Sequence, residues 1–166
     1  MRALNSETTF NIRPATSADI TGIIRLERQS ATAGHWTEEQ YRQAFHRGGP
    51  PRLLLVVEAS SSRPKSGAEG PSLLGFLIAH HLAPEWELEN LVVAPTARRK
   101  GLGKRLLEAL LDAAHETKSS VFLEVRESNA AARALYENAG FEQTGRRKSY
   151  YTSPLEDAIL YRWTVA

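Results

Sequence analysis

The sequence contains no cysteine and a single methionine. Without cysteine the chain can form no disulfide, no thiolate metal site and no thiol nucleophile, so its stability must come from packing. Its five histidines do not form the His-Glu-x-x-His pattern of a zinc protease. These absences exclude cysteine-based catalysis, and we expect no metal site.

Long apolar runs and a strong net charge are also missing. No segment approaches the ~20 apolar residues of a membrane span, and the first residues hold no apolar run of signal-peptide length. We therefore expect a cytoplasmic protein with no membrane partner. The formal charge is +2, from 21 Lys and Arg against 19 Asp and Glu, which is too small to predict a nucleic-acid partner. A chain of 166 residues, 42% hydrophobic, predicts one domain spanning residues 1–166.

Strand and helix patterns alternate along the chain. Alternating or short apolar runs predict strands at 9–13, 53–58, 73–80, 86–93, 121–126, 141–148 and 159–163. Helical spacing and capping residues predict helices from Ser17, from the Thr37–Gln40 capping box to Gly48, at 102–117 and at 130–139. This order predicts an α/β fold with a mixed, partly parallel central sheet and helices on both faces.

The segment at 59–71 reads ASSSRPKSGAEGP and holds only small, polar and structure-breaking residues. This composition predicts a mobile loop. The loop separates two expected strands, so we interpret it as the tip of a hairpin. Nothing in the composition marks a domain boundary there.

A basic, glycine-containing segment joins the strand at 86–93 to the helix at 102–117. At such a junction, unpaired backbone N–H groups and the helix dipole attract an anion, and glycine lets the backbone approach it closely. A solvated basic turn is the alternative. Arg98 and Arg105 exclude a Walker loop, and Leu106 excludes a dinucleotide fingerprint. The remaining pattern is Arg98-x-x-Gly101-x-Gly103, with pyrophosphate as the expected ligand.

This pattern, after the strand LVVAP, resembles the coenzyme A pyrophosphate loop of the GNAT acetyltransferase superfamily. A second stretch, LEVRESNAAARALYENAGF at 123–141, with RRKSYY at 146–151 and EDA at 156–158, resembles the RimI-type ribosomal-protein alanine N-acetyltransferases. The segment HWTE at 35–38 is weakly similar to a tryptophan-containing segment of that subfamily. The resemblance implies an acetyl-CoA-dependent N-acetyltransferase whose acceptor is the N-terminal alanine of a ribosomal protein.

The resemblance also implies which residues bind acetyl-CoA, the co-substrate. The pantetheine arm would pair with Leu91, Val92 and Val93 in a gap between neighbouring strands, and Asn129 would bind it from the next strand end. Pantetheine amides can replace missing sheet hydrogen bonds, and a backbone N–H near Val93 would stabilise the thioester oxyanion. The pyrophosphate would lie on a loop formed by Arg98, Arg99, Lys100, Gly101, Leu102, Gly103 and Lys104.

Acyl transfer to an amine needs a base for the amine and an acid for the departing thiolate. Glu124 and Tyr136 occupy the positions that the resemblance assigns to the base and the acid. Glu124 lies within the apolar strand VFLEVR, and the alternative is a solvent-facing Glu124 paired with Arg126 on the same strand face. Tyr136 also fits the pattern of a core aromatic. Glu87 and Glu89 are rival bases on the neighbouring strand.

The chemistry of the amine favours an N-terminal acceptor. Peptide α-amines titrate near ~7.7–8.0 and lysine near ~10.4, so the neutral α-amine is far more abundant at neutral pH. A small-molecule amine and a lysine side chain remain alternatives. A more remote alternative is a non-catalytic nucleic-acid-binding module that uses the basic residues Arg98, Arg99, Lys100, Lys104, Arg105 and 146–148.

Overall fold

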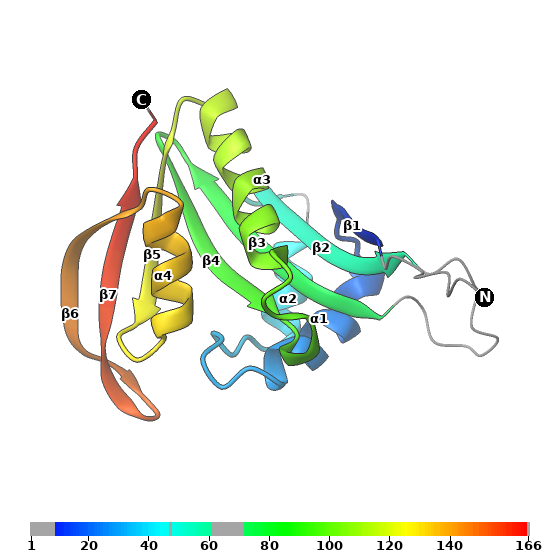
Figure 1. The fold of residues 1–166 in the computed structure, drawn as a ribbon. Coiled ribbons are helices and arrows are strands. Elements are labelled where there is room, and N and C mark those ends of the chain that lie inside the picture. The colour runs from blue at the N-terminus through cyan, green and yellow to red at the C-terminus, as the bar shows by residue number, and fades with distance from the viewer. Residues whose placement is uncertain (1–8, 47, 61–71, 166) are drawn as a thin grey trace, which may run out of the picture.

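The computed structural model describes residues 9–46, 48–60 and 72–165, and its centre is a seven-stranded sheet in the order β1-β2-β3-β4-β5-β7-β6. Helices cover both faces of this sheet, α1 and α2 on one side and α3 and α4 on the other (Figure 1). The mixed α/β fold with helices on both faces is therefore confirmed. The strands are β1 (Thr9–Pro14), β2 (Arg52–Ser60), β3 (Leu73–Leu82), β4 (Glu85–Val93), β5 (Ser120–Arg126), β6 (Glu142–Thr152) and β7 (Leu155–Trp163), and the helices are α1 (Ile20–Arg28), α2 (Glu38–Ala44), α3 (Leu102–Glu116) and α4 (Ala130–Asn138).

The strand pair β4–β5 is parallel, and the neighbours on either side of it run antiparallel. A parallel pair needs a crossover connection, and α3 supplies it. The expected partly parallel sheet is thus confirmed, with its parallel step at the centre of the strand order. Because α3 follows β4 directly, the basic segment of the sequence lies at the β4–α3 junction.

The helix expected from Ser17 does begin there, whereas the expected end of the next helix was wrong. The first helix begins as a 3₁₀ turn, Ser17–Asp19, and becomes α-helical at Ile20. The capping box of α2 forms as expected, because the Gln40 N–H donates to Thr37 Oγ1 and the Thr37 N–H donates to Gln40 Oε1. However, α2 ends at Ala44 and does not reach Gly48. Its C-cap Phe45 still packs against the core, but the next described residues, His46 and Gly48, are exposed, so a longer helix would bury little more apolar surface.

The C-terminal hairpin is longer than the sequence pattern predicted. The pattern gave strands at 141–148 and 159–163, whereas β6 and β7 pair antiparallel over most of Glu142–Thr152 and Leu155–Trp163. β6 is mostly exposed and charged, so its apolar pattern is weak, and the hydrogen bonds to β7 define it. The segment expected to be a mobile loop, 59–71, joins β2 to β3. Its first two residues, Ala59 and Ser60, belong to β2, and 61–71 lie outside the described residues.

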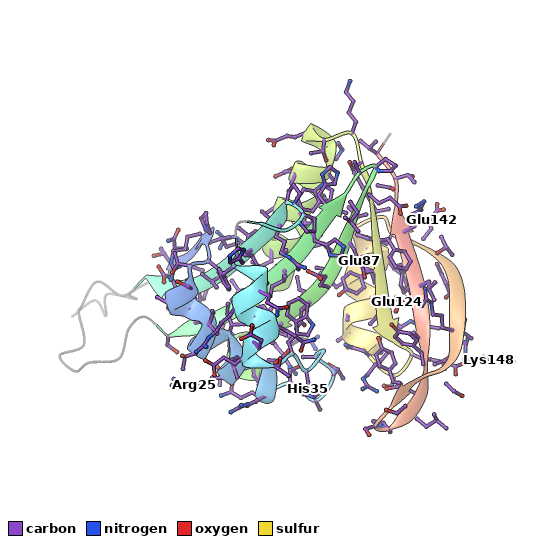
Figure 2. The ribbon with its side chains drawn as sticks, turned by 180° about the vertical axis from the view of Figure 1, so that it is seen from behind. Arg25, His35, Glu87, Glu124, Glu142 and Lys148 are labelled. Carbon is purple, nitrogen blue, oxygen red and sulfur yellow. The ribbon has the colours of Figure 1, made fainter. Side chains whose placement is uncertain are left out.

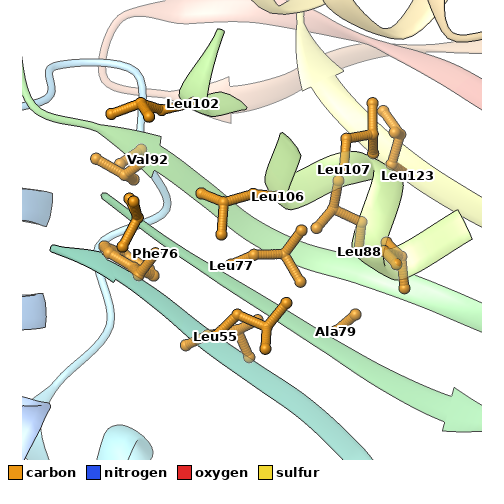
Figure 3. Packing of buried hydrophobic residues seen from close by; sticks show 14 of the residues in the cluster. Leu55, Phe76, Leu77, Ala79, Leu88, Val92, Leu102, Leu106, Leu107 and Leu123 are labelled. Atoms are coloured by element: carbon orange, nitrogen blue, oxygen red, sulfur yellow. The ribbon is translucent and has the colours of Figure 1, made fainter. Parts of the chain in front are cut away.

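The apolar stripe of α3 anchors that helix on the sheet. Its leucines at 102, 106, 107 and 110 are at most 1% exposed and belong to the same buried cluster as Leu77 and Leu88 of β3 and β4. Figure 3 shows Leu106 beside Leu77. Full burial of one leucine contributes about 1.5–3 kcal/mol, so this contact fixes the start of α3 beside the end of β4. On the opposite face, Phe76 packs edge-on against Tyr41 of α2, and Val92 is buried near it.

No helix in the described ranges is long and apolar enough to cross a membrane.

Candidate active site

The two central strands separate before they end. The pairing of β4 with β5 stops at Leu88 and Leu123. Just beyond this point β4 carries a bulge against β3, in which Glu89 is the extra residue. A bulge bends its strand and increases the local twist. Residues 89–93 of β4 therefore have no partner on β5, although both strands lie wholly within the described part of the chain.

A cavity of about 120 Å³ lies where the strands separate. Four predicted site residues line it: Leu91, Glu124, Asn129 and Tyr136. The structure thus brings both candidate catalytic residues together with part of the candidate coenzyme strand. The lining comprises 88–91 of β4, 123–126 of β5, Asn129, Ala132 and Tyr136 at α4, Tyr151 of β6, and residues 30 and 32–34 of the connection between α1 and α2.

Glu124 lies on the sheet face that α1 and α2 cover, between the α1–α2 connection and β6 in Figure 2. Its side chain is 14% exposed, and Arg147 Nε lies 3.1 Å from its Oε1. The Tyr150 hydroxyl also donates to Glu124, which raises the pKa of Tyr150. The alternative of a solvent-facing Glu124 paired with Arg126 is wrong. Arg126 pairs with Glu156 at 2.8 Å, because the β6–β7 hairpin supplies other partners for both strand residues.

Tyr136 is a core aromatic and a cavity residue at the same time. It is 6% exposed, and its ring contacts Phe141 and Tyr161 at centroid distances of 5.7 and 6.3 Å. Burial raises the pKa of the Tyr136 phenol. Tyr151, a second phenol on the cavity wall, has its pKa raised to about 12 by burial and by the Glu124 charge. Asn129 Oδ1 accepts from the Ala132 N–H and so caps α4 beside them.

The rival bases on β4 are held by other side chains. Glu89 lines the cavity, but it is ion-paired with Arg52, and His80 Nδ1 lies 3.1 Å from its Oε1. Burial raises the pKa of Glu89, and the Arg52 and His80 charges oppose this shift. The Glu87 side chain is 48% exposed and lies 3.5 Å from His80 Nε2. Across residues 9–46, 48–60 and 72–165, no group of three or more His, Asp or Glu side chains could hold a metal ion.

The β4–α3 junction presents backbone and positive charge to solvent. Gly101, the N-cap of α3, has a φ of 76°, and Arg99 has a φ of 61°. Left-handed backbone at two nearby residues turns successive N–H groups toward one side, an arrangement that binds anions. Leu102 is 1% exposed, so its side chain belongs to the core and only its N–H can serve a ligand. The exposed cations of the junction are Arg98, Arg99, Lys100 and Lys104.

Gly103 connects this junction to the free end of β4. A Cβ at Gly103 would lie 3.4 Å from Leu135 Cδ2 and 3.7 Å from Val93 Cγ2. Arg98 Nε donates to the Val93 carbonyl at 3.3 Å. The end of β4 at Val93 is therefore a direct neighbour of Arg98 and Gly103, at the start of α3.

Some cavity residues had no role in the sequence interpretation. The run RRKSYY was noted as a motif, but nothing in it indicated that Arg147 contacts Glu124 or that Tyr151 reaches the cavity. The α1–α2 connection supplies Ala33 and Gly34, small residues that carry no chemical signal. The register of the β6–β7 hairpin and the packing of the α1–α2 connection place these residues at the cavity. Neither can be predicted from a local sequence pattern.

Comparison with known proteins agrees with this geometry. The family model described as "Acetyltransferase (GNAT) family" matches residues 22–141. The ribosomal protein bS18-alanine N-acetyltransferase of Salmonella typhimurium is 45% identical over 149 residues, which cover 87% of this chain and 90% of that protein. The N-alpha-acetyltransferase RimI of Mycobacterium tuberculosis is 42% identical over 118 residues, 68% of this chain and 73% of its own. The crystal structure of the ribosomal-protein-S18-alanine N-acetyltransferase from Escherichia coli superimposes with a TM-score of 0.77 at 30% identity and covers 95% of both chains.

Proposed function

Because the chain belongs to the GNAT acetyltransferase family, we propose that it acetylates the α-amine of an N-terminal alanine, carried by a ribosomal protein. Membership of this family, together with its relatives, makes the chain an acetyl-CoA-dependent N-acetyltransferase. The single observation that carries the acceptor assignment is the 45% identity to the ribosomal protein bS18-alanine N-acetyltransferase of Salmonella typhimurium over nearly the whole of both chains.

Acetyl-CoA supplies an acetyl thioester, and the described residues fit its binding. Residues 89–93 of β4 lack a β5 partner, so their backbone groups are free to pair with the amides of the pantetheine arm. We assign this pairing to Leu91, Val92 and Val93, with Asn129 on the opposite side of the cavity. The pyrophosphate would take the N–H groups and positive charge of the β4–α3 junction, Arg98 to Lys104.

Glu124 is the proposed base. Its pair with Arg147 joins a nearly buried carboxylate to a cation whose side chain is 53% exposed, so solvent screens the pair on the Arg147 side. An acceptor ammonium can therefore replace Arg147 beside Glu124. Glu124 then accepts one proton, and the neutral amine nitrogen attacks the thioester carbonyl carbon.

Tyr136 is the proposed acid. When the carbon–sulfur bond breaks, the departing thiolate takes the phenolic proton of Tyr136. The nitrogen loses a second proton as it becomes an amide, and this proton restores the Tyr136 phenol by way of solvent, while the proton held by Glu124 is released. The products are the acetylated amine, free coenzyme A and one proton, so atoms and charge balance. Since burial raises the pKa of Tyr136, the phenol keeps its proton through the neutral range in which the reaction must run.

Mass spectrometry with three acceptors tests the proposal. The acceptors are a peptide that begins with alanine, the same peptide with a blocked N-terminus and an internal lysine, and spermidine as a small amine. We expect acetyl-CoA-dependent acetylation of the first. Preference for the lysine peptide or for spermidine would overturn the α-amine acceptor and leave the family intact. Failure to acetylate any amine, with RNA binding that weakens steeply with salt, would support the nucleic-acid alternative.

A further inference from the structure

A buried carboxylate that the proposed chemistry does not use lies beside the cavity. Glu27, in the last turn of α1, is 2% exposed. Its Oε1 accepts three hydrogen bonds, from the Trp36 N–H at 3.0 Å, the Tyr41 hydroxyl at 2.8 Å and Asn90 Nδ2 at 3.2 Å. Burial raises the pKa of Glu27, and these donors oppose the shift. One carboxylate oxygen thus joins α1 to the α1–α2 connection, to α2 and to β4.

Asn90 extends this link to the cavity wall. Its Nδ2 also donates to the Gly34 carbonyl at 3.3 Å. Asn90 and Gly34 both line the cavity, whereas Glu27 does not. Asn90 is also the residue immediately after the bulge at Glu89, so it stands at the start of the β4 segment that leaves β5. The position of the α1–α2 connection and the course of β4 therefore depend on one hydrogen-bonded group.

Packing and local backbone hydrogen bonds also hold the α1–α2 connection. Between Ser30 and Thr37 it reads ATAGHW, in which Ala33 and Trp36 are the apolar residues that pack in or against the core. The Trp36 ring packs on Tyr41 at a centroid distance of 5.2 Å, so it is fixed by the residue that also donates to Glu27. Beside this packing, the hydrogen bonds at its two anchors, Gly34 and Trp36, tie the segment to Asn90 of β4 and to Glu27 of α1.

We propose that Glu27 is a positioning residue for the acceptor: through Asn90 and the Trp36 N–H it holds segment 30–34 against β4 and so sets the acceptor side of the cavity. This inference rests on the proposed function, since it concerns the same site. Glu27 cannot be the base, because its side chain does not reach the cavity and its Oε1 is occupied by three donors. It acts through the residues that it holds.

The kinetic test compares Glu27→Ala and Glu27→Gln with the control Leu110→Ala. Loss of three hydrogen bonds in Glu27→Ala should raise the acceptor KM by at least ~10-fold and leave the acetyl-CoA Kd within about twofold. Glu27→Gln keeps a side-chain oxygen acceptor and should restore most of the KM. Leu110 is fully buried on α3, on the other face of the sheet, and its truncation should cost about 2–5 kcal/mol of stability without moving the acceptor KM.

An unchanged acceptor KM in Glu27→Ala would overturn the inference, and so would an equal rise in Leu110→Ala, which would mean that lost stability alone is responsible. If Glu27→Ala does not fold, Asn90→Ala carries the same test, because it removes the Gly34 link and keeps the Trp36 and Tyr41 hydrogen bonds. The acceptor KM should rise in this variant as well, and an unchanged value there would equally reject the inference.

Hydrogen exchange separates this inference from the proposed function. The amides of residues 30–37 should exchange faster in Glu27→Ala, or in Asn90→Ala, than in the parent protein. This readout needs no acceptor. A parent protein that acetylates no amine would overturn the proposed function, whereas exchange that is the same in the variants and the parent would overturn the positioning role of Glu27.

Discussion

The Glu124 carboxylate contacts the Arg147 guanidinium and the Tyr150 hydroxyl. Substitution of Glu124 tests its proposed role as the base. Glu124→Gln keeps the size of the side chain and removes the base. We expect kcat to fall by about 10²–10⁴-fold at neutral pH and to recover partly at high pH, where the amine loses its proton without help. The acetyl-CoA Kd should hardly change. A pH–rate profile with a peptide that begins with alanine checks this.

Glu87 and Glu89 provide the matched controls on the neighbouring strand. Glu87→Gln changes an exposed carboxylate outside the cavity, and Glu89→Gln changes one that is held by Arg52. Neither substitution should abolish turnover. Near-parental activity of Glu124→Gln, combined with loss of activity in either control, would move the base from β5 to β4.

Tyr136→Phe should show the opposite pH behaviour. The ring contacts with Phe141 and Tyr161 remain, and only the donor for the thiolate is lost. Because the leaving group still departs unprotonated at any pH, the loss of kcat should persist at high pH. A parallel pH–rate profile measures this. Recovery of Tyr136→Phe at high pH, in the manner expected for Glu124→Gln, would show that the hydroxyl does not act as the acid.

At the scale of elements, the start of α3 is expected to bind the pyrophosphate. In Gly103→Val, the new Cβ meets Leu135 and Val93 at ordinary contact distances, and valine is no worse than glycine in a helix, so folding should be retained. The branched side chain should block the ligand from the backbone and raise the acetyl-CoA Kd at least ~10-fold, about 1.4 kcal/mol. Acetyl-CoA should slow hydrogen exchange at 99–104 in the parent chain but not in the variant.

Gly49→Val is the control for this substitution, because a Cβ at Gly49 would meet no atom of the described residues within 4 Å. Its acetyl-CoA Kd should match that of the parent protein. Equal losses of stability and of binding in Gly103→Val would mean that this glycine serves only packing.

The ion pair between Arg13 of β1 and Asp19, just before α1, should make the stability of the fold depend on pH. Arg13 donates two hydrogen bonds of 2.9 Å to Asp19, and these hold the pKa of Asp19 below its usual value. A lowered pKa in the folded state stabilises the fold above the unfolded pKa, and this stabilisation is lost as the pH falls through the folded pKa. Asp19→Asn should therefore lower the free energy of unfolding by about 1.5–3 kcal/mol at neutral pH.

Denaturant unfolding from about pH 7 down to about pH 2.5 measures this difference, which should shrink below about pH 4 as Asp19 gains a proton. The control is Glu38→Gln, which breaks an exposed pair with Arg42 and should cost less than about 1 kcal/mol. A difference between Asp19→Asn and the parent protein that stays constant with pH would exclude the ionic contribution.

At the scale of the whole molecule, β4 and β5 separate beyond Leu88 and Leu123, and acetyl-CoA is expected to bind between them. A ligand that binds only the folded state stabilises it by about 2.7 kcal/mol at a concentration of 100 Kd. For a chain of this size this corresponds to a rise in Tm of about 5–11 °C. Calorimetry should show this rise in one cooperative transition, as the prediction of one domain over residues 1–166 requires. Two transitions, or an unchanged Tm at saturation, would contradict the prediction.

Local patterns in the sequence determined much of the fold. The leucine spacing of 102–117 placed α3, the Thr37–Gln40 box placed the start of α2, and the strand order predicted a partly parallel sheet. The glycines and cations at 98–104 marked the β4–α3 junction. These features depend on residues within a few positions of one another, because helix periodicity, capping and turn formation act over one or two turns of backbone. The roles of Glu124 and Tyr136 came from the motif resemblance and stay predictions.

The tertiary structure alone decided which side chains meet. The bulge at Glu89 directs β4 away from β5, Arg147 pairs with Glu124 through the register of the β6–β7 hairpin, and Glu27 meets Asn90 across 63 positions of sequence. Each contact depends on sheet register and on the packing of helices against the sheet. Both are set by the sum of many distant contacts, and no single local pattern encodes them. The sequence therefore determined most of the elements and the position of the basic β4–α3 junction, whereas three-dimensional packing determined the cavity and the side chains that surround Glu124.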